Sequence, residues 1–310
     1  MTNLSVYLAR SAYEHPDGRA LAHDDTTTSY SALANDVARF ADYLIDGGLQ
    51  PGDRAGVMLP NGPEFAVVFY GVMQAGGVVV PLNASLHARA VEFYLTITGA
   101  RMLFVSPRHA VAYTVAAVTA GTQPVEVGKH GITQLMAGFP GRSEPVSRAA
   151  SDAAVVSPIA EATGPHTVQL THGELAHSQA ATAGLLLPLG ENDVVMGCLP
   201  MTERLGMTCG LLAPLSSGST LMLPSFDPVF DPASALEIIA AERVTVFEGV
   251  PVMYEAMLDA AHHNDEDFSS LRICVSADGS LPVDISRRFE DRFGCVVIGA
   301  DELLSASPRA

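Results

Sequence analysis

Basic residues are scarce in this sequence, and lysine is almost absent. Lys129 is the only lysine among 17 basic residues, whereas acidic residues number 34, so the formal net charge at pH 7 is -17. Proteins bind the phosphate backbone of nucleic acids through clustered Lys and Arg, and anionic membrane surfaces attract basic segments in the same way. The charge therefore argues against both nucleic acid and an anionic membrane surface as partners.

Long apolar runs and paired cysteine motifs are also missing. No apolar run approaches the roughly 18 residues of a membrane-spanning helix, and the N-terminus lacks the basic-then-apolar layout of a signal peptide. The cysteines, at positions 198, 209, 274 and 295, lie in apolar surroundings without C-x-x-C spacing, which indicates reduced core residues rather than zinc ligands. We expect a soluble, cytoplasmic protein with no membrane insertion.

The residues that are abundant are apolar ones. Of 310 residues, 48% are hydrophobic and 16% are charged, a composition typical of a folded globular protein rather than a disordered one. The length suits two domains of roughly 150 residues each. Structural signals are weak between residues 110 and 150, and this predicts a boundary that separates a first domain, 1–150, from a second, 151–310.

Strand and helix patterns alternate along the chain. Apolar residues recur with a helical period from Ser31 to Gly47. We expect alternating strands and helices after it at 55–59, 64–73, 78–82, 88–98 and 101–105, and further strands at 193–199, 244–247 and 271–276. Short connections between such elements indicate parallel sheets covered by helices. The predicted fold class is α/β, with two stacked layered subdomains and largely parallel sheets.

Two stretches resemble the N-terminal domain of the adenylate-forming superfamily. Residues 51–83 read PGDRAGVMLPNGPEFAVVFYGVMQAGGVVVPLN, and residues 170–172 read LTH at an expected helix start. The superfamily includes acyl-CoA and aryl-CoA synthetases, which join a carboxylate to ATP and usually pass the acyl group to coenzyme A. The resemblance implies their N-terminal fold. The small barrel and the C-terminal domain with a catalytic lysine, which follow in the family, are not among these 310 residues.

The phosphate loop of that family is altered in this chain. The family loop reads Thr-Ser-Gly-Thr-Thr-Gly-x-Pro-Lys-Gly, in which glycines admit backbone N–H groups and the lysine neutralises phosphate charge. Aligned on LTH, residues 159–164 read IAEATG, and His166 holds the lysine position. Thr163 and Gly164 are the vestiges of a cofactor-binding loop. Glu161 would oppose phosphate, since like charges 4 Å apart cost about 4 kcal/mol at a dielectric of 20.

Two interpretations of this segment remain open. Residues 157–167 form an ordinary surface turn, or they form a repurposed loop in which His166 and Glu161 act as ligands or as an acid–base pair. In both cases we expect ATP and Mg binding to be lost or weak, so that the protein has no cofactor of its own.

The resemblance also implies substrate-binding positions in the second half of the chain. The family stretch Pro-Leu-Phe-His-x-x-Gly borders the acyl site and corresponds to residues 200–206, where Thr202 and Glu203 replace the aromatic residue and the histidine. Glu302 corresponds to the magnesium ligand, and Asp301 to the threonine that meets the phosphate. The implied substrate-binding residues are Arg204, Met207, Val250, Ala277, Asp278, Gly279, Ile298 and Gly299.

Three functional hypotheses follow from these residues. The first is a non-adenylating relative that binds a small acyl or aryl ligand, a CoA thioester or a protein partner through the former active-site cleft, with a homodimer among the partners considered. The second is a repurposed enzyme with His166, Glu203 and Asp301 as catalytic acid–base residues. The third is an ATP-dependent carboxylate–CoA ligase that a partner completes in trans.

Overall fold

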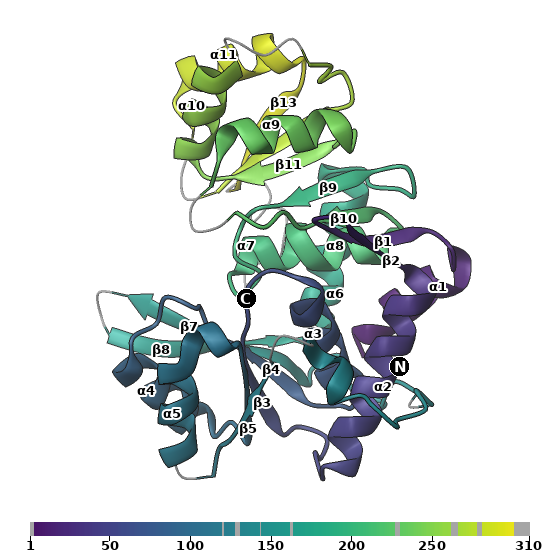
Figure 1. Ribbon diagram of the computed structural model, residues 1–310, viewed down its shortest axis with the longest axis vertical. Coiled ribbons are helices and arrows are strands. Elements are labelled where there is room, and N and C mark those ends of the chain that lie inside the picture. The colour runs from purple at the N-terminus through teal and green to yellow at the C-terminus, as the bar shows by residue number, and fades with distance from the viewer. Residues whose placement is uncertain are drawn as a thin grey trace. The chain divides into compact units, whose positions relative to one another are not determined.

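The computed structural model describes residues 3–119, 121–127, 131–142, 144–161, 164–226, 230–261, 266–277 and 281–300. The chain divides into two compact units, residues 1–13 with 31–176 and residues 14–30 with 177–310. Each unit is built on a largely parallel sheet, which confirms the predicted α/β class (Figure 1). Among the described residues, no helix has the length and apolar character needed to cross a bilayer.

The first unit contains a six-stranded sheet with the strand order β6-β5-β3-β4-β7-β8. Its strands are β3 (Arg54–Met58), β4 (Val78–Pro81), β5 (Met102–Val105), β6 (Gln123–Glu126), β7 (Ala153–Glu161) and β8 (Gly164–Thr171). Its helices are α1 (Ser5–Glu14), α2 (Tyr30–Asp46), α3 (Pro63–Gln74), α4 (Ala88–Thr98) and α5 (Ala110–Val118), with short turns η1 (Pro107–His109) and η2 (Gly131–Gln134). The continuous apolar runs of β4 and β5 are fully buried, as expected of central parallel strands.

A β-hairpin stands where the sequence predicts a surface turn between residues 157 and 167. Strands β7 and β8 are antiparallel, and their register pairs Ile159 with His166 and Glu161 with Gly164. The expectation of a simple turn is wrong for most of this segment, because cross-strand pairing continues up to the pair Glu161–Gly164. Pairing was not anticipated because the segment lacks the alternation of apolar and polar residues that marks a half-buried strand.

The second unit contains a seven-stranded sheet with the order β13-β12-β11-β9-β10-β1-β2. Its strands are β1 (Arg19–His23), β2 (Thr26–Ser29), β9 (Val194–Gly197), β10 (Thr220–Met222), β11 (Val246–Gly249), β12 (Ile273–Ser276) and β13 (Val296–Gly299). Its helices are α6 (His172–Ala181), which begins in the first unit, η3 (Thr182–Leu186), α7 (Arg204–Met207), η4 (Thr208–Leu212), α8 (Ala213–Ser216), α9 (Pro232–Ala241), α10 (Pro251–Ala260) and α11 (Val283–Phe293). Only the β1–β2 pair is antiparallel.

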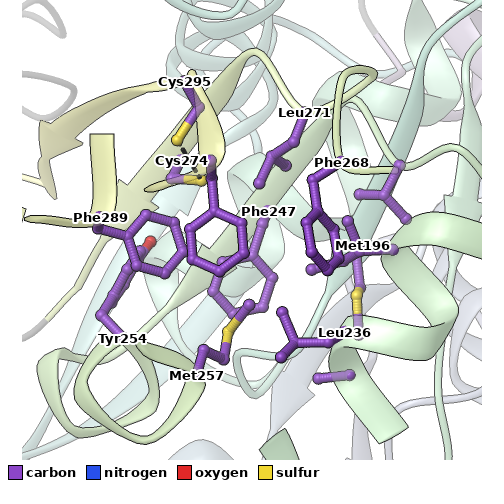
Figure 2. Close-up of a cluster of buried hydrophobic side chains, with 14 of the residues drawn as sticks. Met196, Leu236, Phe247, Tyr254, Met257, Phe268, Leu271, Cys274, Phe289 and Cys295 are labelled. Carbon is purple, nitrogen blue, oxygen red and sulfur yellow. Dashed lines mark hydrogen bonds between the residues drawn. The ribbon is translucent and has the colours of Figure 1, made fainter. Parts of the chain in front are cut away.

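An aromatic core covers one face of the second sheet (Figure 2). Phe247 of β11 meets Tyr254 of α10 edge to face, with ring centroids 5.5 Å apart, and Tyr254 meets Phe289 of α11 in the same way at 4.9 Å. The Tyr254 hydroxyl donates a 2.7 Å hydrogen bond to the carbonyl of Val275, so its polar atom is satisfied inside the core. These contacts attach α10 and α11 to strands β11 and β12.

Candidate functional site

A row of four residues crosses the second sheet near the carboxyl ends of its strands. The register aligns Gly197 of β9 with Glu248 of β11, Glu248 with Val275 of β12, and Val275 with Ile298 of β13. Residues in register on parallel strands face the same side of a sheet. In open α/β sheets, ligands bind beyond the carboxyl ends of the strands, so this row marks the candidate site.

The face that carries the row is covered by helical segments with unusual geometry. The apolar cluster on this face consists of Leu187, Val195, Cys209, Val246 and Val275. Cys209 belongs to η4, a π-helical turn between α7 and α8, and Leu187 follows η3, a second π-helical turn. Single π-helical turns occur frequently at functional sites. Both π-helical segments thus pack on the face that carries the row.

Glu248 is the charged-type residue at the centre of the row, and its side chain is 0% exposed. Neither carboxyl oxygen has a hydrogen-bond partner of ordinary geometry among the described residues. Burial raises the pKa of the Glu248 carboxyl well above its ordinary value, and the backbone N–H of Leu199 offsets part of this increase. The neutral acid is therefore favoured.

Glycines provide the space that the Glu248 carboxyl occupies. A Cβ on Gly210 of η4 would overlap Oε1 of Glu248, and a Cβ on Gly197 would lie 3.5 Å from the same oxygen. The nearby thiols of Cys198 and Cys209 have raised pKa values, because they are buried and because Glu248 is close to them. The carboxyl group thus packs against the glycine backbone of η4.

Four of the residues implied by the resemblance lie at this same edge, and a fifth lies in helix α7. Ile298 and Gly299 are the last two residues of β13, and Ala277 follows β12 directly. Val250 follows β11 and precedes the first turn of α10. Met207 is buried at the end of α7. The described structure therefore brings Val250, Ala277, Ile298 and Gly299 to the carboxyl ends of three neighbouring strands, β11, β12 and β13.

Glu203 and Arg204 begin the helical segment that continues into η4. Both side chains are exposed, and the Glu203 carbonyl accepts a 2.8 Å hydrogen bond from the N–H of Met207. Gly206 allows this turn to pack on the preceding loop, because a Cβ there would overlap the carbonyl oxygen of Pro200. Within the described residues Arg204 makes no ion pair, so its guanidinium can meet an anion.

Of the three residues predicted as catalytic, two are described, and they belong to different units. His166 is half-buried on β8 of the first unit, whereas Glu203 belongs to the second unit. Asp301 lies outside the described residues. So do the predicted positions Thr163, Asp278, Gly279 and Glu302. Within the described part of the chain, no group of three or more His, Cys, Asp or Glu residues could hold a metal ion.

The residues of the β7–β8 hairpin differ from those of the family's phosphate loop. Ile159 and Ala160 offer neither hydroxyl nor flexible glycine backbone, and His166 replaces the lysine. The backbone on both sides of the tip forms an antiparallel two-stranded ladder that reaches the Glu161–Gly164 pair. No chemical step through ATP is assigned to these residues.

Sequence reasoning missed Glu248. The signal was present, because Glu248 is the single charged residue in the apolar run VTVFEGV at residues 244–250. A charged residue within a strand buried on both faces is rare unless it is paired. The sequence could identify the residue as unusual, but its lack of a partner required the structure.

The α/β architecture is that of the adenylate-forming superfamily, as predicted. The chain belongs to the AMP-binding enzyme family, whose model matches residues 8–300. A feruloyl-CoA synthase from Amycolatopsis is 32% identical, and the match covers 98% of this chain and 60% of that protein. A benzoate–CoA ligase from Thauera aromatica is 29% identical, with 93% and 56% covered.

Solved structures agree with this assignment. A benzoate CoA ligase from Burkholderia xenovorans LB400 superimposes with a TM-score of 0.86 and 28% identity, over 96% of this chain and 60% of the other. The chain therefore spans about 60% of the length of the relatives that it matches.

Proposed function

We propose that this protein binds a small acyl or aryl acid, free or as its CoA thioester, at the carboxyl edge of the second sheet, and that it makes no acyl adenylate by itself. The observation that carries the proposal is the β7–β8 hairpin. Glu161 and His166 lie on paired strands there, at positions that would have to hold phosphate. The carboxylate of Glu161 and the replacement of the family's lysine by His166 support a binding role without adenylation.

The second sheet supports the choice of ligand. Its carboxyl edge carries Ile298, which is partly exposed, and the exposed Arg204 begins the helical segment that continues into η4 on the same face. Small-molecule sites are mostly apolar, with a few polar groups that fix orientation. Two relatives are named for aromatic acids, ferulate and benzoate. An acid whose carboxylate meets Arg204, and whose body lies on the apolar residues, suits this chemistry.

The test is the shift in melting temperature with Mg-ATP, AMP, coenzyme A, a panel of free acids and their CoA thioesters. A ligand at about 100 times its dissociation constant adds about 2.7 kcal/mol of stability. We expect stabilisation by at least one acid or thioester and no shift with Mg-ATP. Stabilisation by Mg-ATP would contradict the proposal. If no small molecule shifts the melting temperature, a protein partner becomes the next ligand to test.

A ligase completed in trans is the second candidate, and one observation favours it. The relatives are CoA ligases, and this chain matches only about 60% of their length. The test adds the separately produced C-terminal domain of the Amycolatopsis relative and measures ATP-dependent formation of aryl-CoA. Thioester formed only in the mixture would establish the ligase, whereas no thioester above the level of either part alone leaves the binding protein.

A further inference from the structure

The first unit has a cavity at the carboxyl ends of strands β3, β5 and β6. The register pairs Met58 of β3 with Val105 of β5, and Val105 with Glu126 of β6. The residues that follow these three leave the sheet side by side and line a cavity of about 410 Å³. The lining consists of Leu59, Ser106 and Val127 from these positions, together with Pro60, Glu64, Pro107 and Arg108.

The cavity lies where the connections of this sheet change direction. Strands β3 and β5 are neighbours, but the chain leaves β3 through α3 toward β4 on one side, and it leaves β5 through α5 toward β6 on the other. Such a change opens a crevice beyond the carboxyl ends of the two strands, and open α/β sheets bind their ligands there. Small-molecule sites have volumes of roughly 300–1,000 Å³, so this cavity suits a small ligand.

The lining combines apolar residues with one acidic and one basic side chain. Leu59 and Val127 are buried, Glu64 is half-buried and Arg108 is exposed. Among the described residues that line the cavity, Glu64 and Arg108 are the only charged ones. Their formal charges cancel, so a ligand with a single charge meets one attractive and one repulsive group. A ligand that carries both charges can meet an attractive group at each.

Local structure fixes both charged residues beside the cavity. Glu64 lies in the first turn of α3, where the helix dipole favours a negative charge. Gly131 leaves room for its carboxyl group, because a Cβ there would lie 2.9 Å from Oε1 of Glu64. The Ser106 hydroxyl accepts a 3.4 Å hydrogen bond from the N–H of Arg108 and thereby caps η1. Each charged residue thus lies in the first turn of a helical element.

We propose that this cavity is a ligand site of the first unit and binds a small zwitterion, an amino acid whose remaining atoms are apolar. The carboxylate of the ligand meets the guanidinium of Arg108, which stays protonated in proteins, and its ammonium group meets the carboxylate of Glu64. The apolar atoms lie against Leu59 and Val127. Hydrogen bonds between charged groups are about twice as strong as neutral ones, so loss of either charge weakens binding. The site does not depend on the function proposed for the second sheet.

The experiment compares two zwitterions with analogues that lack one charge. L-leucine is compared with 4-methylpentanoate and 3-methylbutylamine, and 6-aminohexanoate, whose charges lie farther apart, with hexanoate and pentylamine. Dissociation constants are measured by calorimetry for the wild type, Arg108→Gln and Glu64→Gln. The controls are Arg89→Gln and Glu92→Gln, at exposed residues of α4 that do not line the cavity. We expect at least one zwitterion to bind the wild type and both controls at least tenfold more tightly than its analogues.

The two cavity variants separate the contributions of the two charges. Arg108→Gln should weaken the zwitterion at least tenfold and bind the corresponding amine no more weakly than the wild type does. Glu64→Gln should weaken the zwitterion to a similar degree and bind the corresponding acid no more weakly. An acid bound at the second sheet contributes equally in all of these proteins, so it does not affect the differences between them.

Two results would overturn the inference. One is that neither zwitterion binds the wild type, or that neither binds it more tightly than its own analogues. The other is that Arg108→Gln and Glu64→Gln bind the zwitterions as tightly as the two controls do, which would place the binding elsewhere. Neither result bears on the acid site of the second sheet, whose failure would be seen as an unchanged melting temperature with every acid and thioester.

Discussion

Gly210 of η4 lies directly against Oε1 of Glu248, so that a Cβ at position 210 would overlap the carboxyl group. The helical segment η4 and the buried strand β11 thus pack together at this point, where the glycine of η4 contacts the glutamate of β11. We expect Gly210→Ala to destabilise the protein by about 1–3 kcal/mol, the usual cost of overpacking.

A double-mutant cycle checks the origin of this effect. Glu248→Ala removes the carboxyl that Gly210→Ala would meet, so the second substitution should cost less in that background. Urea unfolding of the four proteins gives the coupling free energy. A value near zero would show that the overlap is relieved elsewhere, for example by movement of η4.

The pH dependence of stability should reveal the buried carboxyl. The folded pKa of Glu248 is raised above its ordinary value of 4.5, so above this pH the folded state binds more protons than the unfolded state at this group. Its contribution to stability is therefore lost progressively as the pH rises from 4.5 toward the folded pKa. We expect Glu248→Gln to gain stability relative to the wild type between pH 5 and pH 8, as measured by urea unfolding. Parallel profiles for the two proteins would contradict the raised pKa.

His172 should have the opposite effect on stability. Burial, and secondarily the charge of Arg148, lowers the pKa of His172 from 6.5 to about 4, against a smaller opposing effect of Asp152. Its Nδ1 accepts a 3.2 Å hydrogen bond from the N–H of Leu4, which requires the neutral ring. The stabilisation is present above pH 6.5 and is lost as the pH falls to about 4, by about 3 kcal/mol. His172→Gln should flatten the unfolding profile in this window, and an unchanged profile would refute the assignment.

Arg204 is expected to hold the carboxylate of the ligand. Replacing it by alanine should weaken acid binding about tenfold or more, because hydrogen bonds to charged groups contribute roughly 1.5–3 kcal/mol. The stability of the empty protein should hardly change, since this side chain is exposed and makes no ion pair within the described residues. Arg243→Ala, at a second exposed arginine of the same unit, is the control. Equal losses in the two variants would indicate a general effect of charge.

The hairpin should be dispensable for acid binding. If residues 157–167 have no ligand, Glu161→Ala and His166→Ala should leave the dissociation constants for acids within twofold of the wild type. Calorimetry with the tightest acid of the panel checks this. A tenfold loss in either variant would instead establish the repurposed loop that the sequence left open.

Local features of the fold were predictable from the sequence. The T-x-x-E pattern at Thr171 and Glu174 predicts a capping box, and the structure contains it: the N–H of Thr171 donates to Glu174 at 2.7 Å, and the N–H of Glu174 donates to the Thr171 hydroxyl at 3.2 Å. Such signals succeed because both partners lie within one turn of the chain. The alternation of strands and helices was predictable for the same reason.

Long-range features were not predictable in this way. The pairing of Leu21 with Leu221 joins β1 to β10 across 200 residues of sequence, and no local pattern specifies such a partner. The surroundings of Glu248 depend equally on tertiary structure, because the sequence marks this glutamate as unusual but its complete burial and its fit against Gly210 are seen only in the fold. Resemblance located the edge of the sheet, but only packing identified its central residue.

The distribution of cysteine means that a thiol-alkylating reagent can label the second unit but not the first. All four thiols belong to the second unit, and those of Cys209, Cys274 and Cys295 are buried. A buried thiol reacts with an alkylating reagent only when the structure around it opens, and different parts of a protein open with different free energies. The rate of alkylation, followed by mass spectrometry, therefore reports the opening of the second unit alone, and a ligand bound at its sheet edge would be detected as protection of Cys209.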